Sequence, residues 1–320
     1  MTAEQGRHDK AFVGIPTFLR SPYCADLDQL KPCWAVLGMP FDEGSPFAPG
    51  SRFGPRSIRE HSLRFNSAGV FDCTRRTPLL TGAVRQGYVT DIGDVDVIPG
   101  SPSRSLRNLT DTIARVLEQG ARPLTIGGDH TVTFPVVRAF KEPMHVIQFD
   151  AHLDYSPVTQ GLGDHNAQSF RRLHSLTHVQ SLTQIGIRGL RNDERDLHDA
   201  LEHGSHIVHM PQLRDQGAAA VLSHIPAGAS VYVSIDIDGY DSTLTPGCVS
   251  AEPGGITFDQ MEQLLDVVGS RFDVRGFDLV EVNPQLDVGT GVTSYLAAHT
   301  LIGLLGRIFA AEGAQRARAA

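Results

Sequence analysis

The chain has 320 residues, of which 41% are hydrophobic and 20% are charged, as is usual for a globular protein with a sizeable core. Its formal net charge of -8 argues against a nucleic-acid-binding protein, because such proteins need a basic surface to neutralise phosphates. The four cysteines form no C-x-x-C pair, which argues against a zinc ribbon and against a thioredoxin-like redox site.

The N-terminus, MTAEQGRHDK, is polar and lacks the apolar core of a signal peptide. We find no stretch that is long and apolar enough to cross a bilayer, so we expect no membrane partner. Together with the cysteine pattern, these features predict a cytoplasmic protein whose thiols stay reduced.

Short apolar segments bounded by Gly, Pro or Asp recur along the whole chain. They lie at residues 34–39, 122–128, 144–150, 182–187, 230–238 and 274–282. Segments this short are typical of buried strands in a parallel sheet. Helices are predicted at residues 103–119 and 257–268, from apolar spacings of three or four, and near 291–309, which is rich in Ala and Leu. This alternation predicts an α/β fold: a three-layer α/β/α sandwich around a mostly parallel sheet.

Polar residues cluster directly after three of these strands, where α/β sheets bind their ligands. The clusters are GGDH (127–130), DAHLD (150–154), and Asp236 with Asp238 and Asp241. Alternate side chains of an extended chain share a face, so the acidic and histidine residues of each cluster converge if the chain stays extended. If the strands are neighbours, one crevice receives four carboxylates and two imidazoles.

Four carboxylates in one crevice would repel one another unless cations balance their charge. Two divalent cations supply four positive charges, and a mixed oxygen and imidazole set suits Mn²⁺, with Ni²⁺, cobalt or zinc as alternatives. Two such ions would lower the pKa of a shared water and make hydroxide available near neutral pH. Taken alone, the GGDH turn and the Asp-x-Asp pair have structural explanations. Asp-x-His-x-Asp at a buried strand end favours a metal site instead.

Four segments, GGDH, DAHLD, SIDIDGYD and DLVEVNP, resemble the signature segments of the ureohydrolase family of arginases and agmatinases. The N-terminal GIPTFLR resembles the arm of the guanidinobutyrase and guanidinopropionase branch. The resemblance implies a single arginase-like domain over residues 1–320, with an N-terminal arm of about residues 1–33. It also implies a binuclear manganese site and a homo-oligomer, either a trimer or a hexamer.

The resemblance implies a role for each residue of these segments. His130 and Asp154 would bind mainly one metal, His152 and Asp238 the other, and Asp150 and Asp236 would bridge the two. Asp154 would also pass a proton to the leaving amine, and Glu281 would hold the guanidinium by charge-assisted hydrogen bonds. His165 would shuttle protons, and Asp241 would support the ligands.

Two segments depart from the family pattern where the mouth of the substrate pocket is expected. One places Asn166 and Ser169 after His165, and the other covers residues 248–251 and begins with Cys248. We expect Asn166, Ser169 and Cys248 to contact the substrate, and the added bulk to shorten the room for a long tail. A neutral amide can donate to a carboxylate or accept from a guanidine N–H, so these residues leave the charge of the tail open.

The predicted reaction is hydrolysis of a small cationic guanidino compound to an amine and urea, or an analogue of urea. The N-terminal arm favours a short guanidino acid such as 4-guanidinobutyrate, the altered loops favour a small alkyl guanidine or biguanide, and agmatine is the alternative. A binuclear phosphoesterase is a rival enzyme, but its GNH-type segments are missing. A non-catalytic partner subunit of a ureohydrolase complex is the rival outside catalysis, and it would be expected to have lost ligands.

Overall fold

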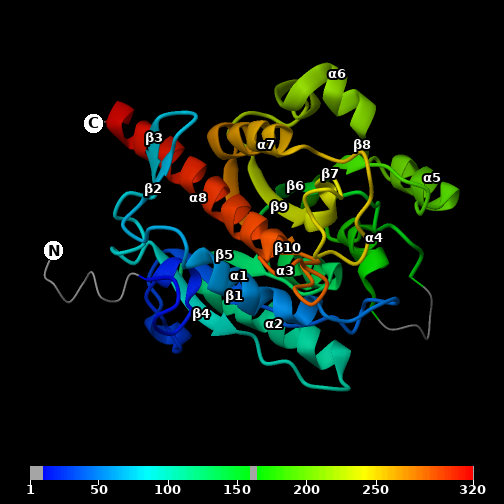
Figure 1. Ribbon diagram of the computed structural model, residues 1–320. Helices are drawn as coiled ribbons and strands as arrows, with labels where there is room; N and C mark the ends of the chain where they lie inside the picture. Colours follow the sequence, from blue (N-terminus) through cyan, green and yellow to red (C-terminus); the bar gives the residue numbers. More distant parts are fainter. Residues whose placement is uncertain (1–9, 159–163, 320) are drawn as a thin grey trace, which may run out of the picture.

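An eight-stranded parallel sheet forms the centre of the protein (Figure 1). The computed structural model describes residues 10–158 and 164–319. From edge to edge, the strands are β4 (Val89–Asp94), β1 (Trp34–Gly38), β5 (Arg122–Ile126), β10 (Asp273–Val280), β9 (Ser230–Asp236), β6 (Met144–Phe149), β7 (Val179–Ile187) and β8 (His206–His209). Every pairing between these neighbours is parallel, so all carboxyl ends meet at one edge of the sheet.

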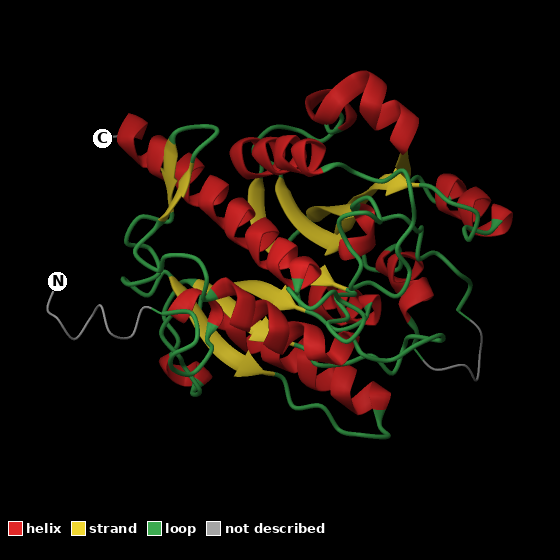
Figure 2. Ribbon diagram, viewed as in Figure 1, coloured by secondary structure: helices red, strands yellow, loops and turns green. Residues whose placement is uncertain are grey.

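Helices cover both faces of the sheet, which confirms the predicted three layers (Figure 2). One face carries α1 (Gly54–Ser62), α6 (Met210–Val221), α7 (Phe258–Arg271) and α8 (Val292–Ala319). The other carries α2 (Pro102–Glu118), α3 (Thr133–Arg138), α4 (Ser169–Leu173) and α5 (Glu194–Glu202). Each set buries its apolar side against the sheet in its own core cluster. An antiparallel hairpin, β2 (Val70–Asp72) with β3 (Thr77–Leu79), lies outside the main sheet.

All the predicted strands occur, and the two main-sheet strands that were not predicted, β4 and β8, lie at the edges. Edge strands are partly exposed, so their sequences, VTDIGD and HIVH, carry polar residues in place of a continuous apolar run. The predicted helix at 257–268 is α7, and Thr257 caps it by accepting from the N–H of Gln260.

Helix α8 contradicts the expectation that no segment could span a bilayer. By length and composition, Val292–Ala314 is apolar enough to do so. However, 72% of its most apolar window is buried, and the helix packs against α7 and α1 (Figure 1). It is therefore a core helix of this fold, since a helix that is apolar nearly all round can be buried in protein instead of lipid.

A buried ion pair joins α1 to the edge strand β4 and to the N-terminal segment. Arg59 on α1 donates to both oxygens of Asp91, over 2.8 and 3.0 Å, and its remaining nitrogen reaches Asp94. Asp91 also accepts from the backbone N–H of Phe18, over 2.8 Å. Both side chains of the central pair are more than nine-tenths buried, so each charge depends on the other. The boundary of the arm near residue 33 stays a prediction, and residues 1–9 lie outside the described part of the chain.

We expect Asp91→Ala to lower the free energy of unfolding by about 3–5 kcal/mol, because it removes the buried partner of the Arg59 charge and leaves only the half-exposed Asp94 beside it. The matched control is Glu60→Ala, which removes an exposed ion pair with Arg56 one helical turn away. Such exposed pairs contribute at most about 0.5 kcal/mol. Urea unfolding at a fixed metal concentration measures both, and equal losses for the two variants would contradict the argument.

Candidate metal centre

Four neighbouring strands, β5, β10, β9 and β6, end together at the carboxyl edge of the sheet. Strand β5 leads to His130, β10 leads to Glu281, β9 ends in Asp236, and β6 leads into the DAHLD segment. The predicted metal site depends on these strands being neighbours in the sheet. They are neighbours, because β6 pairs with β9, and β10 pairs with both β9 and β5. The structure brings together all the residues predicted as metal ligands: His130, Asp150, His152, Asp154, Asp236 and Asp238.

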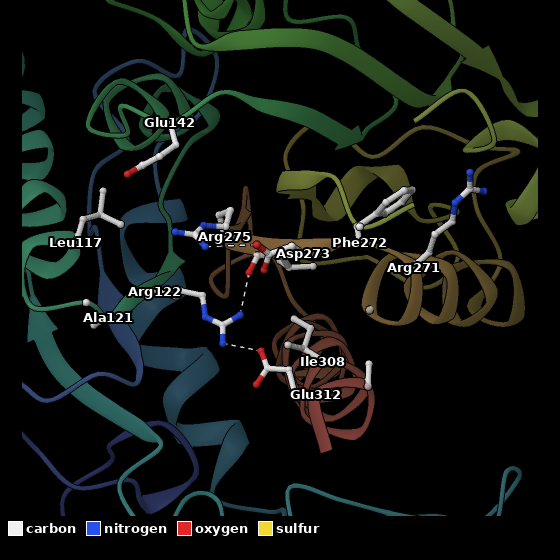
Figure 3. A pocket seen from close by; sticks show the side chains of 15 residues that line it. Leu117, Ala121, Arg122, Glu142, Arg271, Phe272, Asp273, Arg275, Ile308 and Glu312 are labelled. Carbon is white, nitrogen blue, oxygen red and sulfur yellow. Dashed lines mark hydrogen bonds and ion pairs between the residues drawn. The ribbon is translucent and has the colours of Figure 1, made fainter. Parts of the chain in front are cut away.

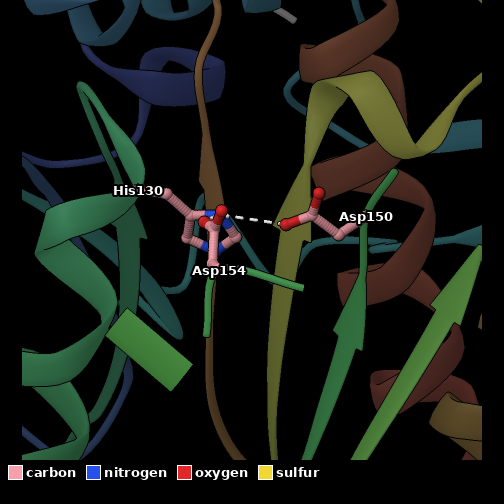
Figure 4. A group of neighbouring side chains, drawn as sticks. All are labelled: His130, Asp150 and Asp154. Atoms are coloured by element: carbon pink, nitrogen blue, oxygen red, sulfur yellow. Dashed lines mark ion pairs between the residues drawn. The ribbon is translucent and has the colours of Figure 1, made fainter. Parts of the chain in front are cut away.

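Three carboxylates surround one ring nitrogen of His130. Its Nδ1 lies 3.1 Å from Oδ2 of Asp150, 3.0 Å from Oδ2 of Asp154 and 3.1 Å from Oδ2 of Asp236. Figure 4 shows the imidazole facing the first two of these carboxylates. The nitrogen is fully buried and has no hydrogen bond of acceptable geometry. A cation between these four groups would satisfy all of them, so the donor set fits a divalent metal.

His152 forms a second, adjoining group of donors. Its Nδ1 lies 3.0 Å from Oδ2 of Asp238 and 3.6 Å from Oδ1 of Asp150. Asp150 therefore directs one oxygen toward each imidazole, as a ligand shared by two ions would. Asp236 and Asp238 also lie within 4.8 Å of each other and of the Cys248 thiol.

The side chains converge through turns and not along extended strands, so the expectation of an extended chain is wrong. The carboxylate of Asp236 accepts from the N–H of Asp238, over 2.8 Å, and closes a short 3-10 turn at Ile237–Gly239. Asp154 and Glu281 have φ of 47° and 65°, a region that is costly for residues other than glycine. Strain of this kind is often held at functional sites, where the surrounding structure maintains it.

The backbone of the GGDH segment determines the position of His130. A Cβ on Gly128 would lie 1.7 Å from the carbonyl oxygen of Phe41, so only glycine fits there. Asp129 points away from the ligands and accepts from the N–H groups of Thr131 and Gly44, over 3.0 and 2.8 Å. It therefore caps the turn that carries His130 and anchors the loop opposite.

Hydrogen bonds behind His130 fix its tautomer. Its Nε2 lies 2.9 Å from the hydroxyl of Ser234, which donates to Asp278 over 2.7 Å. Because the Ser234 proton is given to Asp278, Ser234 must accept from a protonated Nε2. Nδ1 then keeps its lone pair for a cation. Thr133 and Tyr232 complete the shell of hydroxyls around the buried Asp278.

The cluster cannot hold all its charges without added cations. Burial, with a contribution from Asp150, raises the pKa of Asp154 to about 6. Burial, with a contribution from Asp129, raises the pKa of Glu281 to about 8. Burial alone would lower the pKa of His152, but Asp238 and Asp150 outweigh it and raise that pKa to about 12. Divalent cations would replace these protons and let the carboxylates ionise together.

A cavity of about 120 Å³ opens beside the cluster and is lined by Glu281, Asn166 and several of the predicted metal ligands. Val249 and Ser250, from the altered segment 248–251, also line it. The sequence did not single out the other side chains in its wall, which include Phe47, Ser156, Arg191, Asn192 and Asp196. Two of them interact, since the Ser156 hydroxyl donates to the buried carboxylate of Asp196, over 2.8 Å. Apart from Asp196, which lies on α5, these residues lie on loops at the carboxyl edge of the sheet. That position is the signal that could have identified the loop residues.

Three other predicted residues are absent from the described wall of this cavity. Ser169 is buried and donates to the carbonyl oxygen of His130, over 2.8 Å. Cys248 is buried beside Asp236 and Asp238, and burial raises the pKa of its thiol well above the usual value. Burial also lowers the pKa of His165, the predicted proton shuttle. Substrate contact by Ser169 and Cys248 and proton transfer by His165 stay predictions.

Larger hollows lie away from the cluster. One, of about 540 Å³, lies at the amino ends of β5 and β10 (Figure 3). There Arg122 donates to Glu312 over 2.6 Å, and Arg275 lies 3.4 Å from Asp273. Four of the charges in this hollow are paired in this way, and none of the predicted ligands lines it. The smaller cavity is therefore the candidate site on chemical grounds.

Comparison with known proteins agrees with this geometry. The profile of the arginase family matches residues 33–306. The chain belongs to the arginase family. It is 35% identical to guanidinopropionase of Pseudomonas aeruginosa over 92% of both chains, and 33% identical to guanidinobutyrase of that species over 94% of both. Its fold matches that of proclavaminate amidino hydrolase from Streptomyces clavuligerus with a TM-score of 0.82 and 29% identity, covering 93% of this chain and 99% of the other.

The resemblance inferred from the signature segments is therefore confirmed, as is the arginase-like fold. Enzymes of the arginase family hydrolyse C–N bonds of linear amidines in guanidino compounds, and this chain is an amidinohydrolase of that class. Its clusters of Asp and His side chains could hold the metal on which such enzymes depend.

We expect the purified protein to contain about two divalent ions per chain, by the charge balance of the carboxylate cluster. Asp150→Asn should lower this content, because Asp150 lies beside both imidazoles. The control is Glu202→Gln, in an exposed group with His198 and Asp199 on α5 that also has three candidate donors. Elemental analysis should give wild-type content for the control, and one ion or fewer in the active wild-type protein would refute the binuclear site.

Proposed function

We propose that the protein is a binuclear-metal amidinohydrolase that converts a short guanidino compound to an amine and urea, or an analogue of urea. One observation carries this proposal. Glu281 is a buried carboxylate in the wall of the cavity, beside the ligand cluster, and no basic side chain in the described part of the chain forms an ion pair with it. A buried carboxylate that faces a cavity with no cation beside it favours a cationic substrate, which would let it ionise.

The chain's own residues have separate tasks in this proposal. When bound, two divalent cations would make hydroxide available near neutral pH and would stabilise charge on the reacting guanidine. Glu281 would hold the guanidinium by charge-assisted hydrogen bonds and orient its carbon toward the cluster. Asp154 directs Oδ2 to His130, and no described group donates to its Oδ1. That oxygen would take the proton of the attacking water and deliver it to the leaving amine. His165 would relay protons to solvent.

The remaining features of the proposal follow the donor set and the family. Four carboxylates and two imidazoles suit Mn²⁺, with Ni²⁺ as the alternative ion. We propose one catalytic domain with an N-terminal arm, assembled as a trimer or hexamer in the cytoplasm. The complete ligand set supports an enzyme over a non-catalytic partner subunit of a ureohydrolase complex.

Two observations bear on the tail of the substrate. The cavity is small, at about 120 Å³, which supports a short guanidino acid, an alkyl guanidine or a biguanide. Arg191 is exposed in the cavity wall and no described carboxylate pairs with it, which supports a carboxylate tail as in 4-guanidinobutyrate. Asp196, buried in the same wall, supports the alternative of a cationic tail as in agmatine. The names guanidinopropionase and guanidinobutyrase of two relatives favour the guanidino acid.

Glu281→Gln should keep the metals but lower kcat/KM by at least about 30-fold, because removing one partner of a buried charge pair costs about 2–5 kcal/mol. Glu262→Gln is the control, since Glu262 is a partly buried carboxylate on α7 that pairs with Arg307 on α8 and with Arg75, outside the wall of the cavity. Urea release and metal content are measured together. Loss of metal from Glu281→Gln with unchanged substrate affinity would show that Glu281 has been given the wrong role.

A urea-release screen should rank short guanidino acids and small guanidines above agmatine and arginine in kcat/KM. The reason is that a long cationic tail must leave buried polar groups of the small cavity unpaired. If agmatine or arginine ranks first, the choice of substrate is wrong while the metal mechanism stands.

A further inference from the structure

We infer that Asn166 is a positioning residue that fixes Glu281, so that the guanidinium meets only one oxygen of that carboxylate. The inference rests on the proposed function. Asn166 lies in a short 3-10 turn at Asn166–Gln168 and, like Glu281, it lines the cavity. Its side-chain Nδ2 donates to Oε1 of Glu281, over 3.1 Å.

The orientation of the Asn166 amide is determined by its surroundings. Its Oδ1 accepts from the N–H of Ala167, over 2.9 Å, so the amide cannot flip without losing that bond. Its backbone N–H donates to the carbonyl oxygen of Gly44, over 3.2 Å, which ties the turn to the loop across the cavity. One lone pair of its Oδ1 is therefore held by Ala167, which leaves Nδ2 directed at Glu281.

Two donors meet on the same oxygen of Glu281. The backbone N–H of His130 donates to Oε1, over 2.9 Å, alongside the Asn166 amide. No described group donates to Oε2. With Oε1 occupied, a guanidinium cannot engage both oxygens in the paired arrangement that a free carboxylate would allow. Glu281 would therefore bind the substrate through Oε2 alone.

The backbone of Glu281 explains why such support is needed. Its φ of 65° places it in the left-handed region, and its N–H is held by the carbonyl oxygen of Gly128, over 2.8 Å. A residue in this conformation persists only where its surroundings over-determine it. The side-chain bond from Asn166 joins the turn after the DAHLD segment to the end of β10, two segments that are 115 residues apart.

A double-mutant cycle tests the inference, with guanidinium ion as the probe and calorimetry of the metal-loaded protein as the readout. Asn166→Ala should weaken guanidinium binding about tenfold, the usual effect of a lost hydrogen bond to a charged group. In the Glu281→Gln background the same change should have no further effect, because Asn166 acts through the carboxylate. Additive losses, or wild-type affinity for Asn166→Ala, would overturn the inference.

A second variant separates positioning from the shape of the turn. Asn166→Ser keeps a side-chain hydroxyl that can bond within the turn, but it is too short to donate to Glu281 and adds no charge to the cavity wall. It should bind guanidinium as weakly as Asn166→Ala, and wild-type affinity would refute the role of the donor. Gln168→Ala is the matched control, because this neighbouring amide donates to the carbonyl oxygen of Pro157 and does not touch Glu281. Its effect should be additive with Glu281→Gln.

Metal content and circular dichroism of each variant identify any that fail to fold. If Asn166→Ala fails to fold, the cycle is measured with Asn166→Ser. A failure of the proposed function has a different signature. If the wild-type protein binds guanidinium and obeys the cycle but releases urea from no guanidino compound, the positioning role stands and the reaction is wrong.

Discussion

Repulsion among buried carboxylates governs the carboxyl edge of this sheet. Asp150, Asp154, Asp236 and Asp238 lie together with no lysine or arginine bound to any of them in the described part of the chain. Backbone N–H groups relieve part of the repulsion, as where Ala151 donates to Asp238 over 3.0 Å. The remaining repulsion must be relieved by protonation of some carboxylates or by bound cations. The strands that carry these carboxylates are held in place by an apolar core on each face of the sheet, so the repulsion does not separate them.

The same constraint explains why the centre of the site could be predicted from sequence. Strands β5, β6 and β9 are mostly apolar and almost wholly buried, so Asp150 and Asp236 stand out as charges at the ends of β6 and β9. Their order in the sheet could not be derived from the runs alone, because any of several strand orders would bury them equally. The left-handed backbone conformations of Asp154 and Glu281 could not be predicted either, because the alternating pattern of a strand carries no information about the turn that follows it.

The wall of the cavity was predicted less well, for a local reason. Sequence position placed Asn166 and Ser169 on one segment, but the 3-10 turn that begins at Asn166 rotates their side chains to different sides. Asn166 therefore faces Glu281, while Ser169 reaches behind His130 to its carbonyl oxygen. Asp196 has no motif around it, and only the packing of α5 beside the DAHLD segment brings it to Ser156. Loops of this kind are set by tertiary contacts that no short window of sequence contains.

The place of β10 in the sheet has a consequence for the order in which the protein is built. β10 lies between β5 and β9, yet it is the last strand of the chain to be synthesised. Until residues 273–280 leave the ribosome, β4, β1 and β5 form one sheet fragment and β9, β6, β7 and β8 form another, and the inner edges of both are unpaired. Those edges are open to wrong partners during synthesis. Closing the gap brings Glu281 beside His130, 151 residues away. The four carboxylates that follow β6 and β9 therefore meet His130 and Glu281 only in chains whose sheet is complete.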